Sequence, residues 1–171
     1  MSIKLNYTTN TEDIDPYIEN LLKHSKNERV RKILIVIVGI VLLTSSQVFY
    51  KIINPEALVS PFAYIFLYTF GLGFYFFATF KLIKKRNKKA LLKKKDDFIG
   101  GKEAYLTDTS IQVIHKEKTK KENAWDEVTF FVRNDPYIYI HSNKYIYQIK
   151  PSSKIDEVQD NLKQKGVRKK V

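Results

Sequence analysis

The chain contains no cysteine, which excludes disulfide bonds, thiolate catalysis and cysteine-ligated zinc. Its only histidines are His24, His115 and His141, and none stands at ligand spacing from another histidine or a carboxylate. A nucleophile motif and a glycine-rich phosphate loop after a strand are also missing. We therefore expect a non-enzymatic protein with no metal or cofactor, and we interpret the histidines as ordinary surface residues.

Asp, Glu, Lys, Arg and His are absent from two long apolar stretches, residues 33–50 and 57–80. As helices, these stretches would be about 27 and 36 Å long, against a hydrocarbon core of about 30 Å. The pattern predicts a transmembrane helical hairpin, and the lack of intramembrane charge argues against a pump or a monomeric channel. The alternative is a pair of core helices in a soluble domain, but residues 57–80, rich in Phe and Tyr, would then have no solvated face.

Lys and Arg flank both stretches, at residues 23–32 and 81–95, whereas the connecting loop holds only Lys51 and Glu56 as charged residues. The positive-inside rule then places both termini in the cytoplasm. In the loop, Ser60 and Pro61 fit the N-cap and the first residue of the second helix.

The net charge of +12 is concentrated in residues 81–95, which contain nine Lys or Arg and no acid. Apolar residues interrupt this run at helical spacing, so we expect the second helix to continue through it. Its position beside a span favours anionic lipid headgroups as the ligand over nucleic acid. The predicted lipid-binding residues are Lys81, Lys84, Lys85, Arg86, Lys88 and Lys89.

Residues 3–7 alternate apolar and polar side chains, which predicts an N-terminal strand, and a helix capped by Asp13 or Asp15 should follow. Six further strands are predicted at 103–106, 111–116, 122–125, 128–132, 137–141 and 145–149, as an antiparallel meander. A helix from Ser152 or Ser153 to about Gln164 should close the domain, Gly166 should end it, and residues 167–171 should be frayed.

A lone N-terminal strand needs a sheet to join, and the hairpin would return it to the side of the C-terminal strands. We therefore expect an α+β membrane protein in which a two-helix transmembrane hairpin is inserted in a cytoplasmic antiparallel β-domain. The predicted divisions are 1–32 (strand and helix), 33–80 (hairpin), 81–95 (basic segment) and 96–171 (C-terminal β-domain).

This layout resembles the YcxB-like family of bacterial membrane proteins over nearly the full chain. The matching stretches are Tyr7-Thr8, Glu12-Asp13, Leu106-Thr107-Asp108, Trp125-Asp126-Glu127-Val128, Tyr137-Ile138-Tyr139-Ile140 and Ile149-Lys150-Pro151. The last departs from the family order Ile-Pro-Lys. The resemblance implies a pleckstrin-homology-like domain and a bacterial cytoplasmic-membrane location. Some similar proteins accompany bacteriocins or toxins as immunity factors.

Three sets of residues are candidates for contacts other than lipid headgroups. Thr69, Gly71 and Gly73 are small residues in the second span and predict close helix packing. Trp125 is expected to anchor the core, with a partner for its indole N–H. Four tyrosines alternate with isoleucines along two predicted strands. They could form an exposed surface for a partner or simply pack across the strands: Tyr137, Tyr139, Tyr145 and Tyr147.

The leading expectation is a membrane protein that binds a protein partner in self-protection, as toxin or bacteriocin immunity, or in envelope regulation. The alternative is an anionic-lipid-sensing scaffold. A homo-oligomer is a further candidate assembly. A nucleic-acid partner is not expected, because residues 96–171 carry a net charge of only +2.

Overall fold

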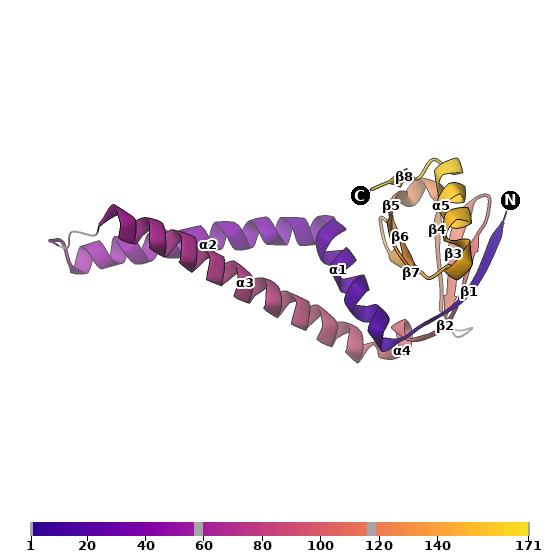
Figure 1. The fold of residues 1–171 in the computed structure, drawn as a ribbon, viewed down its shortest axis with the longest axis horizontal. Coiled ribbons are helices and arrows are strands. Elements are labelled where there is room, and N and C mark those ends of the chain that lie inside the picture. The colour runs from indigo at the N-terminus through magenta and orange to yellow at the C-terminus, as the bar shows by residue number, and fades with distance from the viewer. Residues whose placement is uncertain (1, 57–59, 116–118, 171) are drawn as a thin grey trace. The chain divides into compact units, whose positions relative to one another are not determined.

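The computed structural model describes residues 2–56, 60–115 and 119–170. Its contacts divide the chain into two units, which we call the globular unit (1–20 and 91–171) and the helical unit (21–90). These limits differ from the predicted divisions at 32, 80 and 95, because the end of the basic segment belongs with the strands. Each unit is described by itself below (Figure 1).

The helical unit is an α-helical hairpin. Helix α2 (Lys26–Ile53) and helix α3 (Pro61–Lys93) are both long and apolar enough to cross a membrane. The second helix begins at Pro61, and the Ser60 hydroxyl accepts a hydrogen bond from the Phe62 amide (3.3 Å), as predicted for an N-cap. The predicted start at residue 57 lies outside the described residues. Helix α3 runs on through the basic segment, which confirms the expected continuation.

In the globular unit, β1 (Ile3–Thr9) leads through a 3-10 turn, η1 (Thr11–Asp13), into α1 (Ile14–His24). The burial of β1 alternates strictly, as its sequence predicts. The cap differs from the prediction: Asn10 and Asp13 form a capping box at η1, and Asp13 accepts the Asn10 amide at 2.6 Å.

All six predicted strands are present, with small shifts of their ends. They are β2 (Gly100–Leu106), β3 (Ser110–His115), β4 (Thr119–Ala124), β5 (Val128–Asn134), β6 (Tyr137–Ser142) and β7 (Ile146–Ile149). A short helix, α4 (Lys95–Phe98), precedes β2, and a 3-10 turn, η2 (Trp125–Glu127), joins β4 to β5.

The strands form two four-stranded sheets, and the prediction of a single meander is wrong. Sheet A has the order β1-β2-β3-β4 and is antiparallel, with β1 paired to β2 from Ile3↔Leu106 to Thr9↔Gly100. Sheet B has the order β7-β6-β5-β8. The turn η2 is the physical reason, because it redirects the chain after β4 and starts a second sheet.

The C-terminal tail is ordered up to Lys170, so the expectation of a frayed end is wrong. After η3 (Ser152–Lys154) and α5 (Ile155–Gln164), Gly166 takes a φ of 75° and ends the helix as predicted. The last strand, β8 (Arg168–Lys169), pairs parallel to β5, and the Lys170 amide donates to the Phe131 carbonyl at 2.8 Å. No side-chain cap from Ser152 or Ser153 is formed at α5.

One apolar core lies between the inner faces of the two sheets and α5. Phe131, Ile140 and Leu106 have no exposed surface, and Val158 and Leu162 add the apolar face of α5. A second cluster, built on Val132, Tyr137 and Tyr139, covers the other face of sheet B, where Tyr17 of α1 packs against it. Sheet B is therefore buried on both faces, and sheet A on one.

Candidate membrane-interaction site

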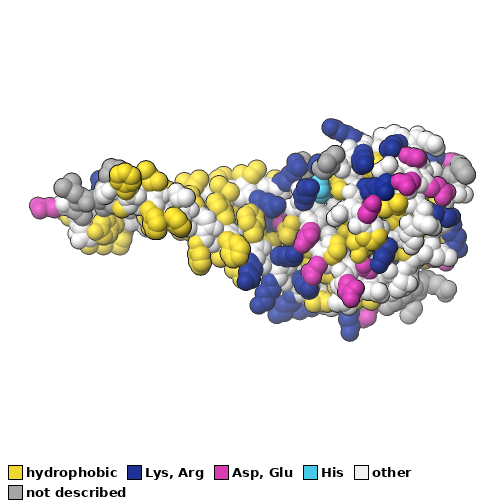
Figure 2. All heavy atoms as spheres, viewed as in Figure 1, with side chains coloured by type: hydrophobic (Ala, Val, Ile, Leu, Met, Phe, Trp, Pro, Cys, Tyr) yellow, Lys and Arg dark blue, Asp and Glu magenta, His cyan; other side chains and the backbone are white. Residues whose placement is uncertain are grey.

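The apolar side chains of the helical unit are exposed. Only 6% of the apolar window of α2 and none of that of α3 is buried inside the protein. Phe62 is 84% exposed, Phe74 75% and Ile52 71%. Figure 2 shows hydrophobic side chains covering the hairpin. A water-soluble protein rarely leaves so much contiguous apolar surface uncovered, so the alternative of soluble core helices does not fit this burial.

The predicted lipid-binding residues lie on the last turns of α3, directly after its apolar part. Lys81, Lys85 and Lys89 recur at i, i+4 and share one helix face. These three and Arg86 are exposed, and none of them forms an ion pair within the described part of the chain. Lys84 and Lys88 are half-buried and have other interactions. Cations at the C-terminal end of a helix are also favoured by the helix dipole.

The flank of α2 is less open. The Lys32 ammonium donates to the Leu22 carbonyl at 2.6 Å and lies 5.7 Å from the centre of the Phe80 ring. The Arg31 guanidinium pairs with Glu28 at 3.4 Å. Lys32 and Arg31 are thus engaged in contacts within the helical unit, whereas Arg29 is exposed like the four cations of α3.

The predicted helix-packing residues divide between two faces of α3. Gly71 faces α2, because a Cβ atom at this position would lie 3.6 Å from the Leu43 side chain. Thr69 is exposed, and Gly73 has no atom within 4 Å of its ideal Cβ position. Only one of the three residues thus serves packing within the hairpin.

The two helices also approach closely at Gly39, which sequence reasoning missed. A Cβ atom there would lie 2.9 Å from the Tyr75 ring. Gly39 is the only glycine of α2 and has no small residue at i+4, so the sequence carried no packing motif to identify it.

A small polar cluster lies between the two apolar helices. The Tyr68 hydroxyl is 3.4 Å from the Thr44 hydroxyl and donates to Gln47 Oε1 at 3.5 Å. Gln47 also lines a groove of about 420 Å³ together with Ser46 and Tyr64. Hydrogen bonds of this kind between apolar helices stabilise a specific packing.

The tyrosine row is not an exposed surface. Tyr139, Tyr147 and Tyr137 are 0%, 3% and 9% exposed, and only Tyr145 reaches solvent. Tyr147 points into the core, where its hydroxyl donates to Asn123 at 2.6 Å, whereas Tyr137 and Tyr139 lie on the face that carries Tyr17. Of the two alternatives that the sequence left open, this burial favours cross-strand packing over an exposed partner surface, because both faces of sheet B are covered.

Polar groups under η1 and α1 form a buried network on sheet B. The Asp13 carboxylate accepts the Tyr137 hydroxyl (2.5 Å) and lies 3.5 Å from the Lys150 ammonium. Burial raises the pKa of Asp13, but the bonds from Tyr137, Asn10 and Lys150 outweigh it and hold this pKa below its usual value. Burial, followed by the bond to Asp13, raises the pKa of Tyr137 to about 12.

Trp125 has its predicted role. It is half-buried and packs against the main core, and its indole N–H donates to the Thr107 carbonyl at 3.0 Å.

The interpretation of the three histidines as surface residues is wrong, since His24, His115 and His141 are all buried. His115 Nε2 donates to the Ile99 carbonyl (3.1 Å), and His141 Nε2 donates to Asn20 Oδ1 (2.8 Å).

Within the described residues, no group of three or more His, Asp or Glu side chains is placed to hold a metal ion. No family model, curated protein or solved structure matches this chain.

Proposed function

We propose that this chain is a non-enzymatic integral membrane protein that is anchored by the α2–α3 hairpin and binds anionic lipid headgroups through the basic end of α3. The observation that carries the proposal is the continuity of α3. One helix joins an apolar stretch with exposed Phe side chains to Lys81, Lys85, Arg86 and Lys89, which have no ion pair among the residues that the structure describes. Each such cation near an anionic surface contributes about 1 kcal/mol.

The basic flanks support an orientation with both termini in the cytoplasm of a bacterial cell. Two facing four-stranded sheets, antiparallel except for the β5–β8 pair, and a closing helix support a pleckstrin-homology-like globular unit. Membership of the YcxB-like family is part of the same proposal. The basic end of α3 would then meet the inner leaflet, whose lipids carry the negative charge.

Alkaline carbonate extraction of membranes tests the anchor. An integral hairpin stays in the membrane pellet at high pH, because its apolar surface and not its charge holds it there. Release of the full-length chain into the supernatant would refute the anchor, whatever the lipid preference.

Lipid co-purification tests the headgroup contact. The full-length chain is reconstituted with equal amounts of phosphatidylglycerol and phosphatidylcholine, and the lipids retained in mild detergent are quantified. We expect enrichment of phosphatidylglycerol, which is lost when Lys81, Lys85, Arg86 and Lys89 are replaced by Gln. The matched control replaces four exposed cations of the globular unit by Gln, with the same charge change: Lys120, Lys144, Lys154 and Lys163. Equal enrichment in both variants would refute the proposed site.

A second candidate function is binding of a protein partner within the membrane, of which protection against a membrane-active toxin is one form. The observation that favours it is the outward face of α3, where Thr69 is exposed and Gly73 has open space around it. Small residues at i, i+4 let another helix approach closely. The partner would be a second copy of this chain or a different protein.

Crosslinking in the native membrane tests this second candidate. We expect a discrete crosslinked species that disappears in Gly73→Leu and persists in Phe74→Leu, whose side chain is 75% exposed beside it. A species that persists in both variants would exclude this face as the contact.

A further inference from the structure

Two lysines of sheet A point to the core side of the sheet. Lys102 of β2 is in register with Tyr7 of β1 and His115 of β3, both of which are buried. Lys121 of β4 lies on the same face as Asn123, whose side chain is 1% exposed and accepts the Tyr147 hydroxyl. Lys102 is half-buried, whereas the side chain of Lys121 reaches solvent. A partly buried charge such as that of Lys102 needs a compensating group.

The surroundings of both ammonium groups are aromatic. Lys102 Nζ lies 4.6 Å from the centre of the Phe98 ring, and Lys121 Nζ lies 5.5 Å from the centre of the Tyr145 ring. Within the described residues, neither ammonium group has an ion pair with a carboxylate. The rings attract each cation but leave its charge uncompensated.

The two lysines also act on each other. By strand spacing and register, their Cα atoms are about 12 Å apart, a distance that two extended lysine side chains can bridge. Burial, and then the positive charge of Lys121, lower the pKa of Lys102 to about 8, although the more distant Asp13 raises it. Lys102 is half-buried and Lys121 is exposed, and an anion between the two ammonium groups would offset the repulsion that the buried one experiences.

We propose that Lys102 and Lys121 form a binding site for a phosphate-type anion at the end of the globular unit where α4 joins β2. A phosphate monoester carries up to two negative charges and several acceptor oxygens, so it can compensate both ammonium groups at once. The anion could belong to a lipid headgroup or be free in solution. The site consists of globular-unit residues alone, so it does not depend on the proposed membrane anchor.

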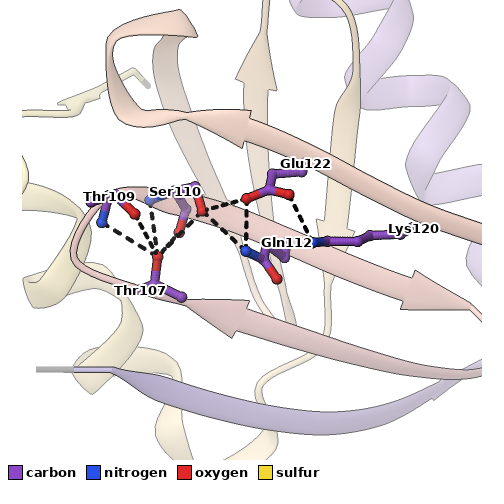
Figure 3. Close-up of polar contacts among 6 residues, drawn as sticks. All are labelled: Thr107, Thr109, Ser110, Gln112, Lys120 and Glu122. Carbon is purple, nitrogen blue, oxygen red and sulfur yellow. Dashed lines mark hydrogen bonds and ion pairs between the residues drawn. The ribbon is translucent and has the colours of Figure 1, made fainter.

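The neighbouring lysine provides a matched control. Lys120 precedes Lys121 on β4, and its side chain lies on the opposite face of sheet A. There its ammonium group pairs with the Glu122 carboxylate at 2.9 Å (Figure 3). Glu122 in turn accepts hydrogen bonds from Gln112 and Ser110. Lys120 already has a carboxylate partner, and an added anion should leave it unaffected.

Competitive labelling of the full-length chain in detergent tests the proposal. A trace of acetic anhydride at pH 8 acetylates neutral amines, and mass spectrometry compares Lys102 with Lys120 in one digest. Inorganic phosphate should favour the charged form of Lys102 and raise its pKa. A rise of one unit would lower the acetylation of Lys102 about fivefold. The acetylation of Lys120 should stay constant, and in Lys121→Gln the effect of phosphate on Lys102 should vanish.

A second arm distinguishes the sources of the anion. The chain is reconstituted in phosphatidylcholine vesicles with or without phosphatidic acid, whose headgroup is a phosphate monoester. Protection of Lys102 by phosphatidic acid alone assigns the site to a lipid headgroup, and protection by inorganic phosphate assigns it to a soluble anion. If neither probe changes Lys102 more than Lys120, the proposal is overturned and the two lysines are a structural pair only. Loss of the chain from the vesicles would instead count against the anchor.

Discussion

In the globular unit Phe131 has no exposed surface, whereas Phe62 in the helical unit is 84% exposed. The same side chain type therefore has opposite surroundings in two parts of one chain. The globular unit hides its apolar residues between sheets and pairs buried polar groups such as Asp13 and Asn123, as a domain in water does. The helical unit does the reverse, which suits a hydrocarbon solvent. The difference fits the proposed membrane anchor, in which the helical unit meets hydrocarbon and the globular unit meets water.

Truncation of a phenylalanine should give the largest contrast between the units. Phe131→Ala removes a fully buried ring and should lower the free energy of unfolding by about 4 kcal/mol, because a cavity replaces the lost contacts. Phe74→Ala removes a ring that is 75% exposed on α3 and should leave the globular unit's stability unchanged. Denaturant unfolding of the full-length chain, followed by Trp125 fluorescence, measures both. Similar losses of unfolding free energy in the two variants would contradict the contrast between the globular unit and the helical unit.

A second contrast concerns two glycines within the helical unit. Gly39→Val places a side chain against the Tyr75 ring and should destabilise the hairpin by about 3 kcal/mol. Gly73→Ala meets no neighbouring atom and should be neutral or slightly stabilising, since alanine favours a helix. The SDS concentration that unfolds the purified chain reports both effects. Equal sensitivity of the two positions would show that α2 and α3 do not pack as described.

Asp13→Asn should destabilise the globular unit by about 2 kcal/mol at neutral pH. The substitution removes the negative charge that the Tyr137 hydroxyl and the Lys150 ammonium contact. Tyr137→Phe is the comparison variant, because it deletes one donor and keeps the carboxylate. Thermal unfolding of the full-length chain at pH 7 measures the loss, and an unchanged midpoint in Asp13→Asn would rule out the network as a source of stability.

The same carboxylate predicts a pH dependence. Since the pKa of Asp13 is lower in the folded chain than in the unfolded chain, its contribution is complete above the unfolded pKa of about 3.9. The contribution is lost as the pH falls through the lower, folded pKa. Stability below about pH 4 should therefore decline more steeply in the wild type than in Asp13→Asn. Parallel acid profiles would refute this assignment.

The smallest effect should come from an exposed ion pair of α5. The Lys163 ammonium lies 3.0 Å from the Asp160 carboxylate, and both side chains are at least half exposed. Lys163→Gln should change Tm by about 1 °C or less, because solvent already screens this pair. Calorimetry of the globular transition measures it, and a shift as large as that of Asp13→Asn would contradict the ranking.

The sequence predicts strand β1 well because its apolar and polar residues alternate clearly. Ile3, Leu5 and Tyr7 alternate with polar residues, and the structure buries them accordingly. Alternation cannot say which strands share a sheet, so the change of sheet at Trp125–Glu127 was not predictable. Strand β8 contains only Arg168 and Lys169 and carries no pattern of its own.

Burial on the second face of sheet B also escaped prediction. Residues 137–141 are all buried, because η1 and α1 cover the face that alternation would leave to solvent. His141 was for this reason interpreted as a surface residue, and for the tyrosines both an exposed row and cross-strand packing stayed open. Of the candidate membrane site, the basic segment and its helical continuation were visible in the sequence. The contact of Gly39 with Tyr75 was not, because it depends on how α2 and α3 face each other.

The most direct test of the account is the sidedness of two single cysteines, which the cysteine-free chain allows without background. Glu56→Cys lies in the loop between α2 and α3, and Asp160→Cys lies on the exposed face of α5. In intact bacterial cells, a membrane-impermeant maleimide should label Glu56→Cys, and it should label Asp160→Cys only after lysis. Labelling of Asp160→Cys in intact cells, or of neither position until lysis, would contradict a hairpin that crosses the membrane with both basic flanks inside.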